Sequence, residues 1–282
     1  MKQYDYIIVG SGIAGLYDAL LLQEVGSVLI LTKGSIDECN TKHAQGGIAA
    51  AISSLDSPEL HSKDTIAAGA GLCDPEAVRI LTEEAADRIS DLVKLGVPFD
   101  TVDGEIALTK EAAHSVPRIL HAGGDATGER IEVTLSNAAR ASKRITIFEY
   151  FLVTEILVRD GKVQGVTALD LHSGSMEEFG CSFLILSTGG IGRLFRITTN
   201  PDIATGDGVA LAYRAGAEII DMEFFQFHPT ALRLPGVPLF LISEAVRGEG
   251  GILRNIKGER FMLKYSPQGD LAPRDVVARG IV

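Results

Sequence analysis

Cysteine, basic residues and long apolar runs are all scarce in this sequence, and each shortage excludes a class of protein. The three cysteines among 282 residues, Cys39, Cys73 and Cys181, are odd in number and far apart. They do not suggest a disulfide framework and fit structural thiols in a reducing cytoplasm. Lysine and arginine number 26 against 37 acidic residues, and the net charge of −11 argues against a nucleic-acid partner. Without an apolar run of roughly 18 residues, no membrane span is predicted.

Two further signals are missing. The first ten residues, MKQYDYIIVG, lack the apolar stretch and cleavage site of a signal peptide, which again favours a cytoplasmic location. Cys39 and His43 lie four residues apart, but two potential ligands do not make a metal site, so no metal is expected. The apolar fraction of 46% and the charged fraction of 22% are those of an ordinary globular protein.

The beginning of the chain carries the pattern of a dinucleotide-binding unit. An apolar, β-branched run at 4–10 predicts a buried parallel strand, and the glycine motif GSGIAG follows at 10–15. A helix through Val25 and a second strand at 28–31 complete the order strand, glycine turn, helix, strand. In such a motif Gly10 permits a tight turn, Gly12 lets the backbone approach a pyrophosphate, and Gly15 lets helix and strand pack closely.

The second strand does not end as a nicotinamide-binding unit requires. An acid at that point usually holds a ribose hydroxyl. Here the strand ends in Thr32-Lys33, and the nearest acids, Asp37 and Glu38, come late. A plain nicotinamide site is therefore disfavoured, and another group must hold the adenosine half.

The rest of the chain alternates helical and strand patterns. Helices are expected at about 59–69, 75–95, 128–141 and 207–216, the second beginning after Asp74 as N-cap with Pro75 in its first turn. Strand-like ITIFEYF precedes a hairpin at 151–170, for which Asp160-Gly161 predicts a type I′ turn. A buried strand is expected within 181–190, and aromatic, proline-rich sequence from about 222 marks a domain boundary.

Eight motifs occur in a recognisable order: GSGIAGL, NTKHAQGGIAA, RILHAGGDATG, STGG, TNPDIATGDGVALAYRAGAE, EFFQFHPTAL, SEAVRGEGG and LAPRDVVARGI. Together they resemble the flavoprotein family of succinate dehydrogenase, fumarate reductase and L-aspartate oxidase over essentially the whole chain. The resemblance implies FAD and a C4-dicarboxylate substrate. It also implies an α/β fold: a Rossmann-like FAD-binding domain over 1–221, with a parallel sheet and a β-hairpin insertion, and the first part of a smaller α+β substrate-capping domain over 222–282.

Three features favour the L-aspartate oxidase branch. Glu111, in the segment LTKEAAHS, would attract a substrate ammonium, which succinate lacks; the alternative is an exposed glutamate at a helix end. Asn40 stands where the succinate enzymes attach FAD through a histidine, so non-covalent FAD is expected. GGDATG together with SEAVRGEGG matches the oxidase pattern. Other polar residues of 107–128, such as His114 and Arg118, have no assigned role, and composition alone would equally suit a solvated loop.

The resemblance also assigns roles to individual residues. His228 and Ser243 would bind substrate beside Glu111, and Arg274 would act as the catalytic acid or base, with Glu244 and Arg247 leading protons to it. A guanidinium is almost always protonated, so a purely electrostatic substrate clamp remains the alternative for Arg274. The residues expected to contact FAD are Gly10, Ser11, Gly12, Ile13, Ala14, Gly15, Lys33, Asn40, Thr41, Ala44, Gln45, Gly46, Gly47 and Asp207.

The implied reaction is oxidation of L-aspartate to iminoaspartate, with oxygen or fumarate as the final acceptor. In the family this is the first step of NAD biosynthesis through quinolinate, with quinolinate synthase downstream. The alternatives are a soluble fumarate reductase or succinate dehydrogenase flavoprotein subunit, and a non-catalytic flavin-binding fragment. Because the chain stops at Val282 soon after the APRD motif, whereas relatives continue, we expect an incomplete catalyst.

Overall fold

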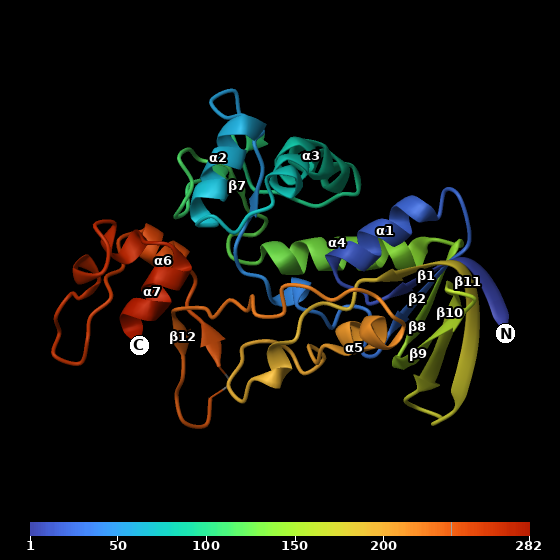
Figure 1. Ribbon diagram of the computed structural model, residues 1–282. Coiled ribbons are helices and arrows are strands. Elements are labelled where there is room, and N and C mark those ends of the chain that lie inside the picture. Colours follow the sequence, from blue (N-terminus) through green and yellow to red (C-terminus); the bar gives the residue numbers. More distant parts are fainter. Residues whose placement is uncertain (238) are drawn as a thin grey trace. The chain divides into compact units, whose positions relative to one another are not determined.

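The computed structural model describes residues 1–237 and 239–282, which form two compact units (Figure 1). The first contains Met1–Ala44 and Gly128–Glu223, and the second contains Gln45–Thr127 and Phe224–Val282. These units differ from the predicted continuous ranges 1–221 and 222–282, because the intervening stretch 45–127 clusters with the carboxyl-terminal residues. The assignment of cofactor binding to one predicted range and substrate capping to the other stays a prediction.

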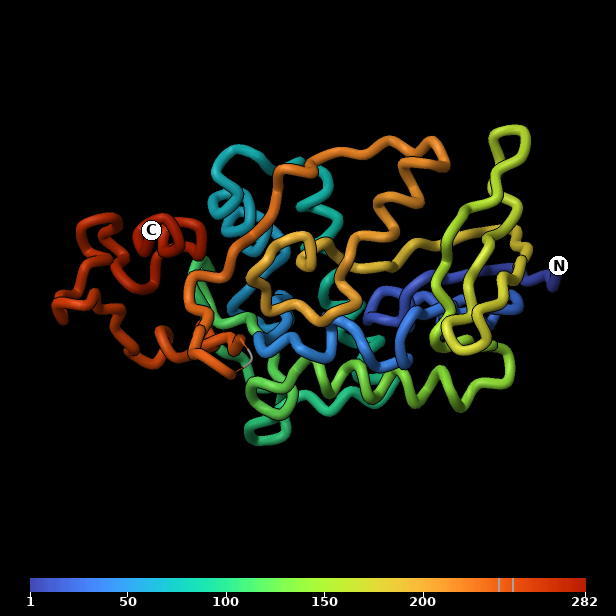
Figure 2. The backbone as a smooth tube through the Cα atoms, turned by 90° about the horizontal axis from the view of Figure 1, so that it is seen from below, coloured from blue at the N-terminus to red at the C-terminus, as the bar shows by residue number. Residues whose placement is uncertain are grey.

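A six-stranded sheet forms the first unit, in the order β8 (Ile145–Glu149), β2 (Val28–Thr32), β1 (Lys2–Val9), β11 (Met176–Leu186), β10 (Lys162–Asp170) and β9 (Phe151–Arg159). The first four strands in this order pair in parallel, and β11, β10 and β9 form an antiparallel meander, which Figure 2 draws in yellow-green. Asp160 and Gly161 have φ of 51° and 70°, as the predicted type I′ turn requires. The α/β class, with a parallel sheet and a hairpin insertion, is confirmed.

Helices of the first unit are α1 (Ile13–Leu22), α4 (Thr127–Ala141) and α5 (Asp207–Arg214), with single 3₁₀ turns at Thr41–His43 and Gly192–Leu194. α1 and α4 lie along the sheet in Figure 1, and Ser142, just after α4, donates a hydrogen bond to Gln23 at the end of α1 (2.5 Å). Gly15 packs α1 tightly on the chain before it, since a Cβ there would lie 2.2 Å from the carbonyl oxygen of Gly10. α1 ends three residues before the predicted Val25.

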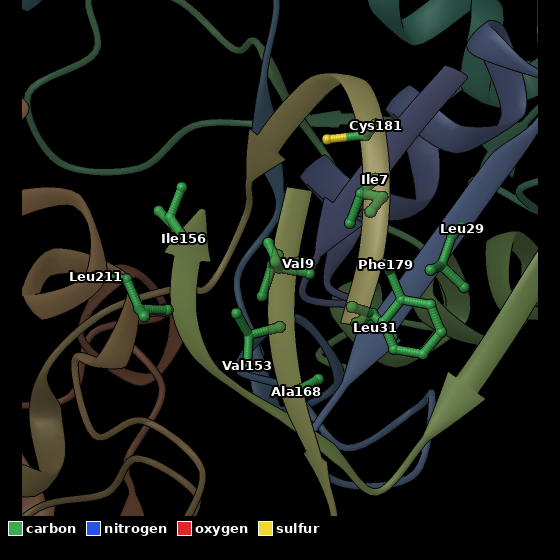
Figure 3. Packing of buried hydrophobic residues seen from close by; sticks show 11 residues of the cluster. Ile7, Val9, Leu29, Leu31, Val153, Ile156, Ala168, Phe179, Cys181 and Leu211 are labelled. Atoms are coloured by element: carbon green, nitrogen blue, oxygen red, sulfur yellow. The ribbon is translucent and has the colours of Figure 1, made fainter. Parts of the chain in front are cut away.

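One face of this sheet carries a continuous apolar core, seen in Figure 3. Ile7 and Val9 point into it from β1, and Leu211 of α5 packs beside Val153 of β9. All five residues of β2 are buried, as expected for a parallel strand covered on both faces. The expected burial of 181–190 is only partly correct: Phe183 is 61% exposed, its ring stacked on Tyr6.

Four helices, several short strands and two 3₁₀ turns make up the described part of the second unit. α2 (Pro58–Ala68) and α3 (Pro75–Lys94) pack on each other, and Asp74 caps α3 by accepting hydrogen bonds from the N–H groups of Glu76 and Ala77. The remaining elements are β3 (Ile48–Ala49), β7 (Ile119–Leu120) and β6 (Leu108–Thr109) in one sheet, the pairs β4 (Thr101–Val102) with β5 (Glu105–Ile106) and β12 (Ala231–Leu232) with β13 (Phe240–Leu241), α6 (Ala245–Gly248), α7 (Arg274–Ile281), and 3₁₀ turns at Met262–Lys264 and Gly269–Leu271.

A small core of Met262, Ala272 and Val277 anchors α7 within this unit. The predicted helices at 59–69, 75–95, 128–141 and 207–216 are confirmed within two residues at each end. In the part of the chain that the structure describes, no helix is long and apolar enough to cross a bilayer.

Candidate functional site

A cavity of about 310 Å³ lies in the first unit, where its central strands end. Val9 of β1, Leu31 of β2 and Leu186 of β11 line it, each within one residue of the carboxyl end of its strand. Open α/β sheets bind ligands outside the carboxyl ends of their parallel strands. The cavity therefore lies where a nucleotide is expected to bind.

The glycine turn between β1 and α1 forms one wall of the cavity. Gly10 has φ of 107°, and a Cβ there would lie 2.2 Å from the carbonyl oxygen of Ser187, so no side chain fits. The turn brings Gly12 and Ile13 to the cavity at the start of α1, where N–H groups and the helix dipole favour an anion. Thr41 fixes the turn by accepting the Ile13 N–H at Oγ1 (3.0 Å).

Lys33 and Asp207 both line the cavity and contact each other there. The Lys33 ammonium forms an ion pair with Asp207 and donates to Thr205 Oγ1 (2.5 Å). Burial alone would raise the pKa of Asp207, but hydrogen bonds from Lys33 and Thr205 outweigh it and hold that pKa below its ordinary value. Asp207 is therefore ionised at neutral pH. Lys33 stands at the end of β2, where an acid is usual.

A thiol and a buried carboxyl lie next to this lining. Cys39 lines the cavity and donates from Sγ to Glu132 Oε2 of α4 (3.1 Å). Burial, and then the charge of Glu132, raises the pKa of Cys39 to about 12, and burial raises the pKa of Glu132 to about 7. Cys39 is therefore a protonated, unreactive thiol, in keeping with the structural role expected from the sequence.

A cluster of charged side chains lies in the second unit. Arg274, at the start of α7, donates from Nε to Glu244 Oε2 (2.5 Å), and Arg247 Nη2 lies 3.3 Å from Glu244 Oε1. Arg247 is buried and also donates to the carbonyl oxygen of Asp270 (2.8 Å), whereas the Arg274 side chain is 37% exposed. Glu244 thus orients two guanidinium groups, of which only that of Arg274 is accessible.

Glu111 approaches the same cluster from the segment between β6 and β7. It is half-buried, and burial followed by the negative charge of Glu244 raises its pKa, against the opposing influence of His121 and Arg274. Two carboxylates and one accessible guanidinium therefore act on one another. A cation bound beside Glu111 would relieve the repulsion between the carboxylates.

The backbone N–H of Thr230 holds His228 in one tautomer. The N–H of Thr230 donates to His228 Nδ1 (3.2 Å), so Nδ1 is an acceptor and the neutral ring carries its proton on Nε2. Burial and the positive charge of Arg274 lower the pKa of His228, which keeps the imidazole neutral. Its Nε2–H is thus prepared to donate a hydrogen bond to an anion.

Comparison with known proteins identifies the family of the chain. The family model described as an FAD binding domain matches residues 5–282. The chain belongs to the FAD binding domain family. Its cofactor is accordingly FAD. The glycine turn fits the diphosphate of that dinucleotide because residues 10–14 line the cavity at the start of α1 and no side chain at Gly10 blocks the approach.

Proteins similar to this chain include L-aspartate oxidases and a quinol fumarate reductase. An L-aspartate oxidase from Synechocystis sp. is 49% identical over 282 residues, which cover 99% of this chain and 50% of the relative. A second L-aspartate oxidase, from Nostoc sp., is 48% identical over 99% of this chain and 48% of the relative. A quinol fumarate reductase from E. coli has a TM-score of 0.92 at 33% identity, covering 100% of this chain and 50% of that one. The chain spans about half the length of the relatives it matches.

Most residues predicted to contact FAD line the cavity. They are Gly10, Ser11, Gly12, Ile13, Ala14, Lys33, Asn40, Thr41 and Asp207. Gly15 is instead buried in the packing of α1, and Ala44 lies outside the lining. Gln45, Gly46 and Gly47 fall in the second unit, where Gly47 packs against the Leu120 carbonyl of β7. The FAD contacts of all these residues stay predictions.

Several lining residues were not predicted. Glu38, Cys39, Phe151, Leu152 and Ile203 come from loops and strand ends that carry no glycine motif. Ser187, Thr188 and Gly189 also line the cavity. They belong to the strand and STGG sequence at 181–190, whose small terminal residues predict another strand end that faces a cofactor.

The predicted substrate residues come together, but a second cluster was missed. Glu111, His228, Glu244, Arg247 and Arg274 influence one another electrostatically, while Ser243 directly precedes Glu244 and is partly buried. Their roles stay predictions.

The missed cluster surrounds Arg118, which is fully buried. Arg118 donates from Nε and Nη2 to Asp56 (2.8 Å each) and from Nη1 to Asp64 (2.6 Å). Positions 56, 64 and 118 form no spacing motif, so nothing local in the sequence signals this cluster.

Proposed function

We propose that the protein uses FAD to oxidise L-aspartate to iminoaspartate, with oxygen or fumarate as the final electron acceptor. Bound FAD supplies the two-electron acceptor. The substrate loses a hydride from C2 and a proton from its amine. The observation that carries the proposal is Glu111, a half-buried carboxylate within the influence of both Glu244 and Arg274. The 49% identity to an L-aspartate oxidase supports the same assignment.

Three polar groups of the second unit match parts of this substrate. The accessible Arg274 guanidinium and the Nε2–H of His228 bind carboxylates, and Glu111 takes the ammonium. Succinate lacks that ammonium, so Glu111 would offer it no partner and would repel its negative charge. Substrate choice in this proposal is set by one carboxylate.

Arg274 also has a chemical role in the proposal. Glu244 holds its Nε, which leaves the terminal nitrogens to bind a carboxylate. To take a proton from the substrate, the guanidinium must first give one of its own protons to Glu244. Arg247 and Glu244 then form the route by which a proton leaves. A purely electrostatic clamp, in which Arg274 only binds a carboxylate, is the alternative.

The cellular setting is part of the same proposal. FAD is bound non-covalently, with Asn40 in the cavity lining where a covalent enzyme would use a histidine. The protein is cytoplasmic, and the iminoaspartate it forms passes to quinolinate synthase for NAD biosynthesis.

A fumarate reductase or succinate dehydrogenase flavoprotein is the second candidate. The likeness to the E. coli quinol fumarate reductase favours it, and both functions need a guanidinium and a neutral imidazole for carboxylates. Glu111 distinguishes them, because only an amino-acid substrate gives it a cationic partner.

Anaerobic flavin reduction tests the proposal. The full gene product, loaded with FAD, is mixed with L-aspartate or with succinate while the visible flavin band is followed. Bleaching by L-aspartate but not by succinate is expected. Bleaching by succinate alone would transfer the assignment to the second candidate, and a bound flavin that neither substrate bleaches would contradict both.

A further inference from the structure

We propose that Asp64 is a positioning residue that fixes Glu111 and thereby sets the preference for a substrate with an ammonium group. This inference rests on the proposed function. Asp64 belongs to α2 and is distant in sequence from Glu111, yet it binds the segment 110–117 that presents the glutamate.

One carboxylate oxygen of Asp64 accepts three hydrogen bonds. They come from the backbone N–H of Ser115 (2.8 Å), the hydroxyl of Ser115 (2.7 Å) and Nη1 of Arg118 (2.6 Å). Hydrogen bonds to an ionised acceptor are about twice as strong as neutral ones. Asp64 therefore ties the far end of the segment to a helix.

The segment itself is compact, so a tie at Ser115 reaches Glu111. The N–H of His114 donates to the Glu111 carbonyl oxygen (3.4 Å), and the Lys110 ammonium donates to the Ser115 carbonyl oxygen (2.8 Å). Ala113 has φ of 66°, a left-handed conformation that non-glycine residues adopt only when their surroundings enforce it. Release of Ser115 would let this turn relax and would move Glu111.

Asp56 provides a matched control within the same cluster. It accepts two hydrogen bonds from Arg118, and its side chain is fully buried. In the described part of the chain it forms no hydrogen bond with residues 110–117. The Asp64→Asn and Asp56→Asn changes each remove one negative charge beside Arg118, but only the first acts directly on the Glu111 segment.

The first test measures the segment itself, without substrate. Backbone hydrogen exchange over 111–116 should become about tenfold faster in Asp64→Asn, the loss expected when one charge-assisted hydrogen bond is weakened. In Asp56→Asn it should change less than threefold. Equal acceleration in both variants would mean that the cluster is only structural, and would overturn the proposal.

The second test measures selectivity in the FAD-loaded full gene product. Asp64→Asn should lower kcat/KM for L-aspartate about tenfold, mainly through KM, and leave binding of the dicarboxylate fumarate within twofold. In a Glu111→Gln background the same change should have almost no further effect. An equal loss with and without Glu111 would overturn the proposal.

Ser115→Ala guards against misfolding of the buried variants. Ser115 is exposed, and this change removes only its hydroxyl hydrogen bond to Asp64. Its hydrogen-exchange rate over 111–116 and its KM for L-aspartate should both rise, as in Asp64→Asn, but by a smaller factor. No change in either quantity would overturn the proposal. If the wild-type protein shows no preference for L-aspartate, the proposed function fails, while the exchange test still decides whether Asp64 holds the segment.

Discussion

Two arginines of the second unit differ in burial, and we relate this difference to a structural role for one and a proposed ligand-binding role for the other. Arg118 is fully buried, and its guanidinium donates to Asp56 through Nε and Nη2 and to Asp64 through Nη1. Arg274 is 37% exposed, and within residues 1–237 and 239–282 its guanidinium has one hydrogen bond, from Nε to Glu244.

The difference lies in how many donors remain for a ligand. A buried charge whose hydrogen bonds are satisfied stabilises one arrangement and has little capacity left for substrate. A partly exposed guanidinium fixed through one nitrogen keeps its terminal nitrogens for a planar carboxylate. We therefore expect substitution of Arg118 to affect folding and substitution of Arg274 to affect chemistry.

The largest effect should come from Arg118→Leu. It leaves the fully buried Asp56 without its partner, which should lower the free energy of unfolding by about 3–5 kcal/mol. Urea denaturation followed by circular dichroism measures the change. Arg79→Leu is the control, because Arg79 pairs with Glu76 and Glu83 on the exposed face of α3 and such pairs contribute about 0–1 kcal/mol. Equal losses in the two variants would remove the distinction.

Arg274→Gln should act in the opposite manner. Flavin reduction by L-aspartate should slow about 100-fold or more, since a preorganised charged donor is lost, while the free energy of unfolding changes by less than about 1 kcal/mol. Arg279→Gln, which removes an exposed arginine of the same helix, should leave the rate within twofold. Stopped-flow spectroscopy under anaerobic conditions gives the rates, and a fast Arg274→Gln variant would contradict the assignment.

Glu132 extends the comparison to a buried group without a cationic partner. Burial raises its pKa from 4.5 to about 7, so between these two pH values the folded protein binds more protons than the unfolded chain. Its contribution to stability must therefore fall as the pH rises from 4.5 to about 7, by a quantity on the order of 2 kcal/mol. Glu132→Gln should flatten that part of the profile, and the exposed Glu129→Gln should not. Denaturation midpoints between pH 4.5 and 8 test this.

The smallest effect is expected at Lys33. Its charge faces the cavity but is already paired with Asp207, so Lys33→Ala should weaken FAD binding only about tenfold. Fluorescence titration of the apoprotein with FAD measures the dissociation constant, with the exposed Lys143→Ala as control. A loss of several hundredfold would mean that Lys33 carries the phosphate contact alone.

The sequence predicts those features that depend on neighbouring residues. The turn at Asp160-Gly161, the cap at Asp74 and the glycine turn at Gly10 each follow from the conformational limits of a few adjacent residues. The predicted end of α1 at Val25 is three residues late, because apolar composition alone marks no stop.

Features that join distant stretches were not predictable in this way. Nothing local indicates that 45–127 clusters with 224–282, or that Asp56 and Asp64 meet Arg118. The exposure of Phe183 depends on what covers that part of the sheet, and the pairing of Cys39 with Glu132 depends on how α4 packs. The cluster around Arg274 was anticipated only because its motifs resemble a known family.

The proposed function depends most directly on Glu111. The ratio of kcat/KM for L-aspartate to that for succinate is measured anaerobically in the FAD-loaded wild type and in Glu111→Gln, with the surface variant Glu129→Gln alongside. Glu111→Gln should lower the ratio at least tenfold, because the variant loses the partner of the substrate ammonium and no longer repels succinate. An unchanged ratio would show that Glu111 does not choose the substrate.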